Sequence, residues 1–224
     1  MTAHLPGALA IEVAGESVVL LPERALWLPA HDVLLVADLH WGKAAALRAA
    51  HVPVPNGTTA SDLARLSIAL SATGARHLVV LGDLLHARTG RHDDTFATIA
   101  AWRAQHMHTH ITLVRGNHDL HAGDPPESLG ILCSNAPWRL GPFIGVHEPV
   151  ANETGYVLGG HLHPSVTVRG RGRLSARLPT YVFGAKLGIL PAFSSFTGGG
   201  MYERQPRDRL YAIAGDEVVA LNAP

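Results

Sequence analysis

The sequence predicts an α/β (α+β) fold in which two β-sheets pack face to face and helices lie on the outside. Apolar, strand-like runs alternate with helical patterns as far as about residue 114, which favours βαβ units and a parallel sheet. After about residue 130 the helical patterns stop, and short strands punctuated by glycine and proline follow. A βαβ first half joined to a β-rich second half is typical of such a layered fold.

Two kinds of strand are expected in the first half of the chain. The first 30 residues read as short antiparallel strands, with IEVA and SVVLL on either side of a turn at Gly15 and Glu16, followed by ALWL. Uninterrupted apolar runs indicate strands that are buried inside a sheet. These runs are VLLVA (33–37), HLVVL (77–81) and ITLV (111–114).

Helices are expected between these buried strands. In the longest one, Leu63, Leu66 and Leu70 recur at helical spacing, and either Thr59 or Ser61 can cap its start. The segment VPVPNG separates the first helix from the second. The predicted helices cover residues 42–50, 60–73 and 93–107.

The second half of the chain is expected to consist of short strands. They are WRL, FIGVH, YVLGG, SVTVR, RLSARL and TYVFG, and a last hairpin forms from LYAIA and EVVAL around Gly215 and Asp216. We find no internal repeat, low-complexity tract or linker. Residues 1–224 are therefore expected to form a single domain.

Composition excludes several classes of protein. A hydrophobic content of 47% excludes a disordered chain, and 18 basic residues balance 18 acidic ones, which argues against a histone-like nucleic-acid binder. A local basic groove would still suffice for a nucleic-acid substrate. The lone Cys133 provides neither an internal disulfide nor a thiolate zinc site. With no signal-peptide pattern and no apolar run of membrane length, we expect a cytoplasmic protein that does not enter a membrane.

Polar clusters that contain Asp, Asn and His come directly after the buried strands. Each cluster alone is explained by a turn or by a surface histidine, but their succession in one chain favours a shared site at one edge of the sheet. Nitrogen and oxygen ligands without sulfur suit manganese, iron or zinc better than calcium. The sequence thus predicts a site for two divalent metal ions that hydrolyses phosphate esters. The candidate ligands are Asp38, His40, Asp83, Asn117, His147, His161 and His163.

Further roles follow from the order of residues in these clusters. The carboxylate of Asp83 can bridge two metals about 3.5–4 Å apart, which can hold a hydroxide for in-line attack on phosphorus. His118 can point at the substrate and protonate the leaving oxygen, and Asp119 can orient its ring. Arg115 can contact either a phosphate or a nearby carboxylate.

The order D-x-H, G-D, G-N-H-D, H, G-H-x-H resembles that of the calcineurin-like metallophosphoesterase superfamily. The resemblance implies a two-sheet metallophosphoesterase sandwich flanked by helices, with His118 as the catalytic histidine and Asp119 beside it. One metal would be held by Asp38, His40, Asp83 and His163, and the other by Asp83, Asn117, His147 and His161. The chain departs from the usual Gly-His of the fourth motif, because Val146 precedes His147.

Several longer segments are similar to the bacterial DNA ligase-associated metallophosphoesterases. This similarity implies a manganese-favouring phosphodiesterase or DNA endonuclease that acts on single-stranded or flexible DNA in repair. It also implies functional association with an ATP-dependent DNA ligase and a helicase. The segments are residues 37–59, VHEP around His147, residues 159–164 and residues 190–199.

Basic residues near the clusters have two interpretations. Lys43 and Arg48 follow the first cluster, and if they line the rim of the site they can hold phosphates of a DNA strand. Otherwise they are solvated loop charges. The same choice applies to a later basic stretch that comprises Arg169, Arg171, Arg173 and Arg177. Trp41 can stack on a base or pack over the metal site.

Two other functions compete with DNA cleavage. The enzyme can instead be a phosphomonoesterase, a nucleotide pyrophosphatase or a small-molecule phosphodiesterase, which the neutral net charge favours slightly. A scaffold that keeps the fold without catalysis would lack some ligands or the catalytic histidine, and none is missing here. The segment LPAFSSF (190–196) can form a lid, an interface or an edge of the core, of which we expect the last.

Overall fold

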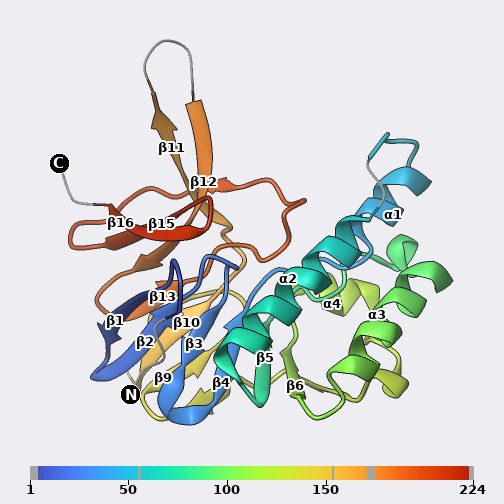
Figure 1. Cartoon of the computed structure of the whole chain (residues 1–224), viewed down its shortest axis with the longest axis horizontal. Coiled ribbons are helices and arrows are strands. Elements are labelled where there is room, and N and C mark those ends of the chain that lie inside the picture. Colours follow the sequence, from blue (N-terminus) through green and yellow to red (C-terminus); the bar gives the residue numbers. More distant parts are fainter. Residues whose placement is uncertain (1–4, 55–56, 153, 171–174, 222–224) are drawn as a thin grey trace.

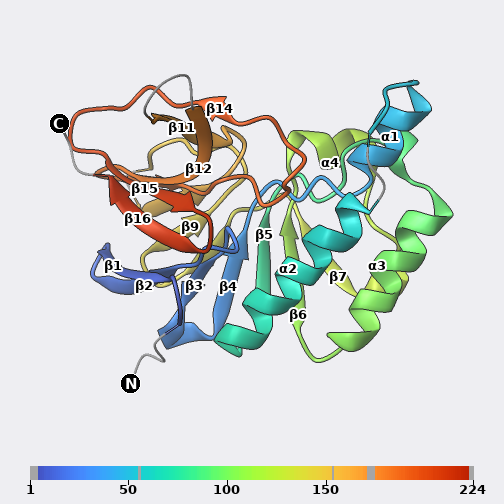
Figure 2. The ribbon, with the colours of Figure 1, turned by 45° about the horizontal axis from the view of Figure 1, so that its top comes forward.

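The structure is a computed structural model that describes residues 5–54, 57–152, 154–170 and 175–221. Two mixed sheets face each other, and helices cover the outer face of the first one (Figures 1 and 2). The predicted two-sheet α/β fold is confirmed. In the described part of the chain, no helix combines the length and the apolar composition needed to cross a membrane.

The first sheet is antiparallel at one side and parallel at the other. Its parallel part comprises β4 to β7, so that the carboxyl ends of these strands lie at one edge. The short strand β7 was not predicted from the sequence. In spatial order the strands are β1 (Leu9–Val13), β2 (Glu16–Leu20), β3 (Leu26–Leu28), β4 (Val33–Val36), β5 (His77–Leu81), β6 (His110–Val114) and β7 (Ile131–Ser134).

The second sheet also contains a parallel group, in which β9 and β13 flank β10. The terminal hairpin β15–β16 attaches to β12. In chain order the strands are β8 (Trp138–Leu140), β9 (Phe143–Gly145), β10 (Tyr156–Gly159), β11 (Pro164–Arg169), β12 (Ser175–Phe183), β13 (Leu187–Ile189), β14 (Gly200–Met201), β15 (Arg209–Ala214) and β16 (Glu217–Leu221). The main path through the sheet is β14-β11-β12-β13-β10-β9-β8.

The predicted helices form, with different ends. The second one begins after Gly57, whose φ of 84° is left-handed, and no side chain caps it. The capping role expected for Thr59 or Ser61 is therefore wrong, because both residues lie inside the helix. A short helix after β6 was not predicted. The α-helices are α1 (Lys43–Ala49), α2 (Thr58–Thr73), α3 (Asp93–Gln105) and α4 (Asn117–Ala122), with 3₁₀ turns at Pro29–His31, Arg88–Gly90 and Glu127–Leu129.

The core has two layers because successive residues of a strand point to opposite faces of a sheet. In β4, Leu34 belongs to an apolar cluster with Leu66 of α2 and Ile99 of α3. The next residue, Leu35, belongs to a second cluster that lies between the sheets and includes Tyr181. This alternation places helices on one face of β4 to β6 and the second sheet on the other.

The strand β12 changes partners at a proline. The sequence predicted two strands, RLSARL and TYVFG. The first two residues of RLSARL lie outside the described part of the chain. The structure instead has one strand through Pro179, which ends the ladder with β11, while Thr180 begins the ladder with β15. Proline lacks an N–H donor, and at this switch between ladders the missing donor is tolerated. The first half of β12 thus forms an arm with β11 (Figure 1).

The hydroxyl of Tyr181 ties the second sheet to the first. The side chain is fully buried, and its Oη lies 2.7 Å from the carbonyl oxygen of Leu21 and 3.0 Å from that of Ala25. We predict that Tyr181→Phe lowers the free energy of unfolding by about 1–2 kcal/mol, because a buried acceptor loses its donor. Urea denaturation measures this change.

A matched control is Tyr211→Phe on the neighbouring strand, whose ring is also buried. Within the described residues its hydroxyl makes no hydrogen bond, so we expect a much smaller loss of stability. Equal losses in the two variants would contradict the role given to the Tyr181 hydrogen bond.

Candidate metal centre

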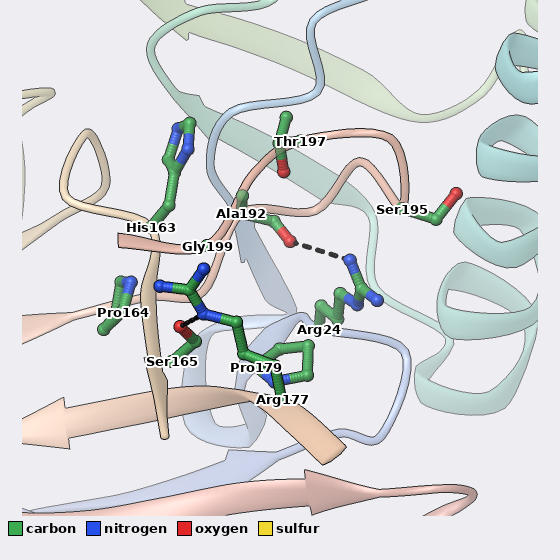
Figure 3. A pocket seen from close by; sticks show the side chains of 10 residues that line it. All are labelled: Arg24, His163, Pro164, Ser165, Arg177, Pro179, Ala192, Ser195, Thr197 and Gly199. Atoms are coloured by element: carbon green, nitrogen blue, oxygen red, sulfur yellow. Dashed lines mark hydrogen bonds between the residues drawn. The ribbon is translucent and has the colours of Figure 1, made fainter. Parts of the chain in front are cut away.

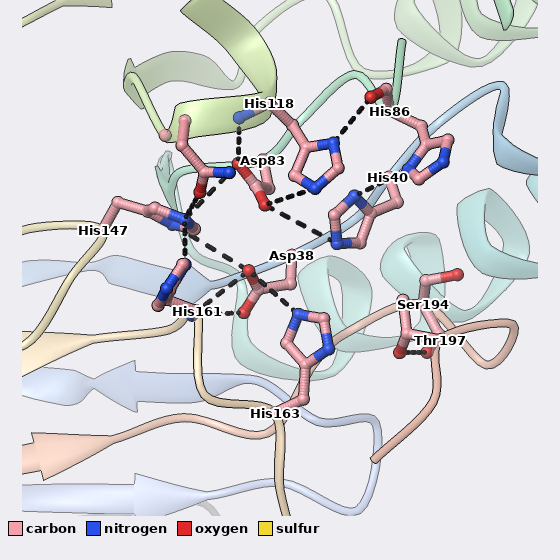
Figure 4. Close-up of polar contacts among 12 residues, drawn as sticks. Asp38, His40, Asp83, His86, His118, His147, His161, His163, Ser194 and Thr197 are labelled. Atoms are coloured by element: carbon pink, nitrogen blue, oxygen red, sulfur yellow. Dashed lines mark hydrogen bonds and ion pairs between the residues drawn. The ribbon is translucent and has the colours of Figure 1, made fainter. Parts of the chain in front are cut away.

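The predicted ligand clusters meet at one place, where strand ends of both sheets converge (Figure 4). From the first sheet, Asp38 follows β4, Asp83 follows β5 and Asn117 follows β6. From the second sheet, His147 follows β9, while His161 and His163 follow β10. Parallel strands within each sheet bring these loops to a common edge. The convergence expected from the sequence is therefore confirmed as geometry.

The backbone of these loops is held in an uncommon conformation. Five of the candidate ligands have a positive φ, a region that side chains other than glycine seldom adopt. Between Asp38 and His40 the chain has left the strand, so that Leu39 is buried in the core at 1% exposure, as predicted. Clustered backbone strain is typical of functional sites. The φ values are 57° for Asp38, 48° for His40, 54° for Asp83, 65° for His161 and 45° for His163.

The carboxylate of Asp83 is approached from several sides. It is 2% exposed, and its Oδ1 accepts the backbone N–H of His118 at 3.0 Å. The Nε2 atom of His147 lies 3.4 Å from Oδ1, and that of His40 lies 3.7 Å from Oδ2. Burial raises the pKa of Asp83, and the charge of His147 opposes this shift. Such a carboxylate, with one oxygen toward each imidazole, has the arrangement of a bridge.

A second carboxylate, that of Asp38, is fully buried beside the first. It accepts the backbone N–H of His161 at 3.0 and 3.2 Å, and the Nε2 of His163 lies 3.3 Å from its Oδ1. The other ring nitrogen of His163 lies 3.2 Å from the carbonyl oxygen of Gly198. A donor bond from Nδ1 to that carbonyl leaves the Nε2 lone pair facing Asp38, and metal-binding histidines are commonly oriented by such a bond from the other ring nitrogen.

The donor set fits cations. When the Nδ1 of His147 donates to the carbonyl oxygen of Leu81 at 3.1 Å, its Nε2 presents a lone pair to the Oδ1 of Asn117 at 2.9 Å. The same Nε2 faces Asp83 and lies 3.0 Å from the Nδ1 of His161. Acceptor atoms that face one another repel, and a cation among them would remove that repulsion.

His40 gives a second indication of a metal ligand. Within the described residues its buried Nε2 has no hydrogen-bond partner. Burial, together with the charge of Lys43, lowers the pKa of His40 to about 2. The ring is therefore neutral, which is the form that binds a metal. Nitrogen and oxygen atoms from Asp38, His40 and His163, and likewise from Asp38, Asp83 and His147, lie within 4.8 Å of one another.

Glycines permit this close approach of side chains. A Cβ atom on Gly160 would lie 2.4 Å from the Oδ2 of Asp38, and one on Gly116 would lie 2.3 Å from the Oδ1 of Asp83. Neither contact is possible without displacing a candidate ligand. The glycines of the G-H-x-H and G-N-H-D motifs are thus explained by space rather than by turn formation.

The sequence analysis missed one member of the site, His86. Its Nδ1 lies 3.4 Å from the Nδ1 of His40, and its ring stacks on that of His118 with centroids 4.9 Å apart. Burial, with the charges of Lys43 and His118, lowers the pKa of His86 to about 4. The available signal was its position three residues after Asp83 in the same loop, which the sequence pattern alone did not distinguish from a surface histidine.

The expected contact between Asp119 and the ring of His118 is wrong. The carboxylate of Asp119 instead accepts the backbone N–H groups of Leu85 at 3.0 Å and Gly116 at 2.9 Å. The ring of His118 is held through its Nδ1, which lies 2.7 Å from the carbonyl oxygen of His86. Asp119 is buried, and burial raises its pKa. It ties the loop after β5 to the start of α4.

In the structure, Arg115 contacts a carboxylate. Its guanidinium donates to the carboxylate of Asp124 at 2.6 and 2.7 Å and to Asn135 at 3.0 Å. The hydrogen bond with Asp124 raises the pKa of Arg115. Of the two alternatives for this arginine, the carboxylate contact is the one that forms.

The other basic residues differ in how deeply they are buried. Lys43, at the start of α1, is half-buried; burial lowers its pKa, and the charge of Asp83 raises it. Arg48 is exposed in the last turn of α1. Two of the later arginines, Arg171 and Arg173, lie outside the described residues.

Two apolar features near the site belong to the core. Trp41 is 3% exposed, and its ring contacts that of Trp102, so it packs and does not offer a face to a base. The segment LPAFSSF is an edge of the core, as expected: Phe193 is fully buried, and its N–H donates to the carbonyl oxygen of Ala37 at 2.8 Å. This segment therefore supports the loop that carries Asp38.

Comparisons with known proteins gave a family match and similar solved structures. Residues 31–182 match the family of calcineurin-like phosphoesterases. The chain is similar to Pseudomonas putida nuclease MPE, whose crystal structure is known. The two sequences are 42% identical, and the TM-score is 0.84 for a match that covers 96% of this chain and 100% of that chain. YfcE, a phosphoesterase from E. coli, is 18% identical, with a TM-score of 0.37 over 82% of this chain and 88% of that chain. No curated protein sequence gave a match.

The matched residues contain every cluster of the candidate metal centre, and the family typically depends on two metal ions. The groups of possible ligands in the structure are consistent with that dependence, so the chain is a metal-binding protein of this kind. It belongs to the calcineurin-like phosphoesterase family and is a hydrolase that acts on phosphoester bonds.

Proposed function

We propose that this protein is a metal-dependent phosphodiesterase that cuts single-stranded or flexible DNA internally, in DNA repair. The observation that carries the proposal is the buried carboxylate of Asp83, which imidazoles from both sheets approach at 3.4 and 3.7 Å. The likeness to a nuclease at 42% identity over nearly the whole chain supports a nucleic-acid substrate. The proposal takes residues 1–224 as one metallophosphoesterase domain, since a single apolar cluster joins both sheets.

The metal ligands are assigned from the two carboxylates outward. Asp83 would be shared between the metals, as its two oxygens face different imidazoles. Divalent cations bound here would supply positive charge that stabilises the phosphate in an in-line displacement and lowers the pKa of a water. Manganese suits this nitrogen and oxygen set, and iron or zinc also fit it. One metal would use Asp38, His40, Asp83 and His163, and the other Asp83, Asn117, His147 and His161.

His118 is proposed as the catalytic histidine. Its side chain is 38% exposed, and its Nε2 lies 3.9 Å from Asp83, so this nitrogen faces the edge of the centre. The carbonyl oxygen of His86 and the stacked ring of His86 hold the imidazole in this orientation. In its protonated form His118 would donate the Nε2 proton to the leaving oxygen. Asp119 contributes by positioning the loops that carry both residues.

Substrate contacts would come from cations beside the centre. Lys43 is one candidate, because it is half-buried at the start of α1 and its charge acts on His40, His86 and His163. Arg48 would reach a more distant phosphate from the end of α1. Association with an ATP-dependent DNA ligase and a helicase, and a cytoplasmic location, are part of the proposal and rest on the sequence resemblance and the lone Cys133. The alternative is a phosphomonoesterase, pyrophosphatase or small-molecule phosphodiesterase, favoured by the balanced net charge.

The function is tested with circular single-stranded DNA and manganese-loaded protein. We expect linear and shorter products from the wild type, because a circle offers no end to an exonuclease. Asp83→Ala should lose this cleavage and also lose bound metal, since the shared carboxylate is removed. Gel electrophoresis measures cleavage, and elemental analysis after dialysis measures metal.

The matched control is Asp216→Ala, which removes an exposed carboxylate from the β15–β16 turn. It should keep both metal and cleavage. Fully loaded wild type that leaves the circle intact but hydrolyses a small phosphate ester would favour the alternative function.

Replacement of the catalytic histidine separates chemistry from metal binding. We predict that His118→Ala keeps its metal content but lowers kcat by about 10²–10⁴-fold, as for a lost general acid. His121→Ala, which removes an exposed imidazole from the same helix, should leave kcat nearly unchanged. Loss of metal in His118→Ala would show instead that this residue is a ligand.

The spacing of the centre is tested through a glycine. We predict that Gly160→Ala weakens metal affinity by about 10–100-fold, because its Cβ would displace the carboxylate of Asp38. Gly198→Ala is the control, since a Cβ there meets no atom within 4 Å. Titration of metal into the apo-proteins measures both affinities, and equal values would refute the steric explanation.

A further inference from the structure

A cavity of about 220 Å³ lies next to the candidate metal centre, on the side of the β11–β12 arm (Figure 3). Its lining combines residues from distant parts of the chain, including Arg24, His163, Ser165, Arg177, Thr197 and Gly199. His163 belongs to both places: its Nε2 faces Asp38 in the metal centre, while its ring forms one wall of the cavity. A group bound in this cavity would therefore lie beside the reacting phosphate.

The cavity is positively charged. Among the described residues that line it, Arg24 and Arg177 are charged and none is acidic. Arginine stays protonated at any physiological pH, so both guanidinium groups are cationic.

Arg177 is held so that its fork of donors faces the cavity. Its Nε donates to the hydroxyl of Ser165 at 2.8 Å, and this hydroxyl in turn donates to the carbonyl oxygen of Gly200 at 2.8 Å. Within the described residues, the two terminal nitrogens of Arg177 make no hydrogen bond. Figure 3 shows this guanidinium directed toward the side of the cavity where His163 stands. The Nε of Arg177 thus fixes the orientation of the guanidinium, and its two terminal nitrogens can donate to a ligand.

The opposite wall is fixed by Arg24. Its Nη1 donates to the carbonyl oxygens of Ser194 at 2.8 Å and Ala192 at 3.3 Å. The glycine-rich segment 198–200 packs closely against Ser165, because a Cβ on Gly199 would lie 2.5 Å from the Oγ of Ser165. The cavity is thus bounded by segments that contact one another directly, and it does not depend on loosely placed surface side chains.

We propose that this cavity binds the phosphate that neighbours the scissile one along a DNA strand, with Arg177 as its main contact. The inference rests on the proposed function and adds the path of the strand, which would run from the metal centre toward the β11–β12 arm. A planar guanidinium matches two phosphate oxygens at once. Such a contact positions a strand without reading its sequence.

Two substrates separate this subsite from the metal centre. We expect Arg177→Gln to lower kcat/KM for a single-stranded oligonucleotide by about 5–100-fold, as for one lost phosphate contact. The same variant should cleave bis(p-nitrophenyl) phosphate at nearly the wild-type rate, because this small diester has no neighbouring phosphate. The slope of log affinity against log salt concentration for the oligonucleotide should become shallower by about 0.7. Arg177→Lys keeps the charge without the planar guanidinium, and its kcat/KM for the oligonucleotide should lie between those of the wild type and Arg177→Gln.

The control is Arg139→Gln, which removes an exposed cation from β8, at the other end of the second sheet. It should change neither rate nor salt slope. If Arg177→Gln matches this control, or if it loses activity equally on both substrates, the subsite is refuted while the proposed function stands. A wild type that cleaves only the small diester would overturn the proposed function and the subsite together.

Discussion

The architecture depends on keeping the carboxylates of Asp38 and Asp83 buried close together at the ends of parallel strands. Oxygen atoms of both lie within 4.8 Å of one another and of a nitrogen of His147. Burial of even one unpaired carboxylate costs several kcal/mol, so neighbouring groups must compensate. The backbone N–H groups of His161 and His118 donate to them, and these come from loops of different sheets. Asp83 is thus stabilised from within the first sheet, whereas Asp38 needs the second sheet in place.

The loops that carry the candidate ligands continue the hydrogen-bond pattern of the parallel strands that precede them. Beyond the end of β4, the backbone N–H of Asp38 donates to the carbonyl oxygen of Gly82 at 3.1 Å, and that of His40 donates to the backbone carbonyl oxygen of Asp83 at 2.8 Å. This pairing extends the parallel ladder into the site and offsets the cost of left-handed backbone at these residues, which is about 1–2 kcal/mol each. The loops are consequently part of the scaffold, and a bound cation would find its ligands already placed.

The balanced net charge of the chain conceals an uneven distribution of cations. Several arginines stabilise loops: Arg115 contacts Asp124, and Arg91 donates to the carbonyl oxygens of Ala122, Gly123 and Asp124 just after α4. Other cations lie beside the metal centre: Lys43, and the cavity residues Arg24 and Arg177. An anionic substrate can thus be attracted locally by a chain whose total charge is zero.

The sequence by itself determined the two-sheet fold and the positions in the chain from which the candidate ligands come. Uninterrupted apolar runs followed by Asp, Asn or His identify buried strands and their ends, because both signals are local in the chain. It also predicted that Leu39 enters the core, since alternate residues of a broken strand face opposite ways.

Only the tertiary structure decided which side chains touch. Asp119 lies next to His118 in sequence, yet the group that holds the His118 ring is the carbonyl oxygen of His86, more than thirty residues away. Arg115 was equally able to contact a phosphate or a carboxylate until Asp124 was placed beside it. The cavity of Arg24 and Arg177 joins segments far apart in the chain. Such contacts depend on how the loops of two sheets come together in space. A local pattern of residues does not specify which distant loops become neighbours.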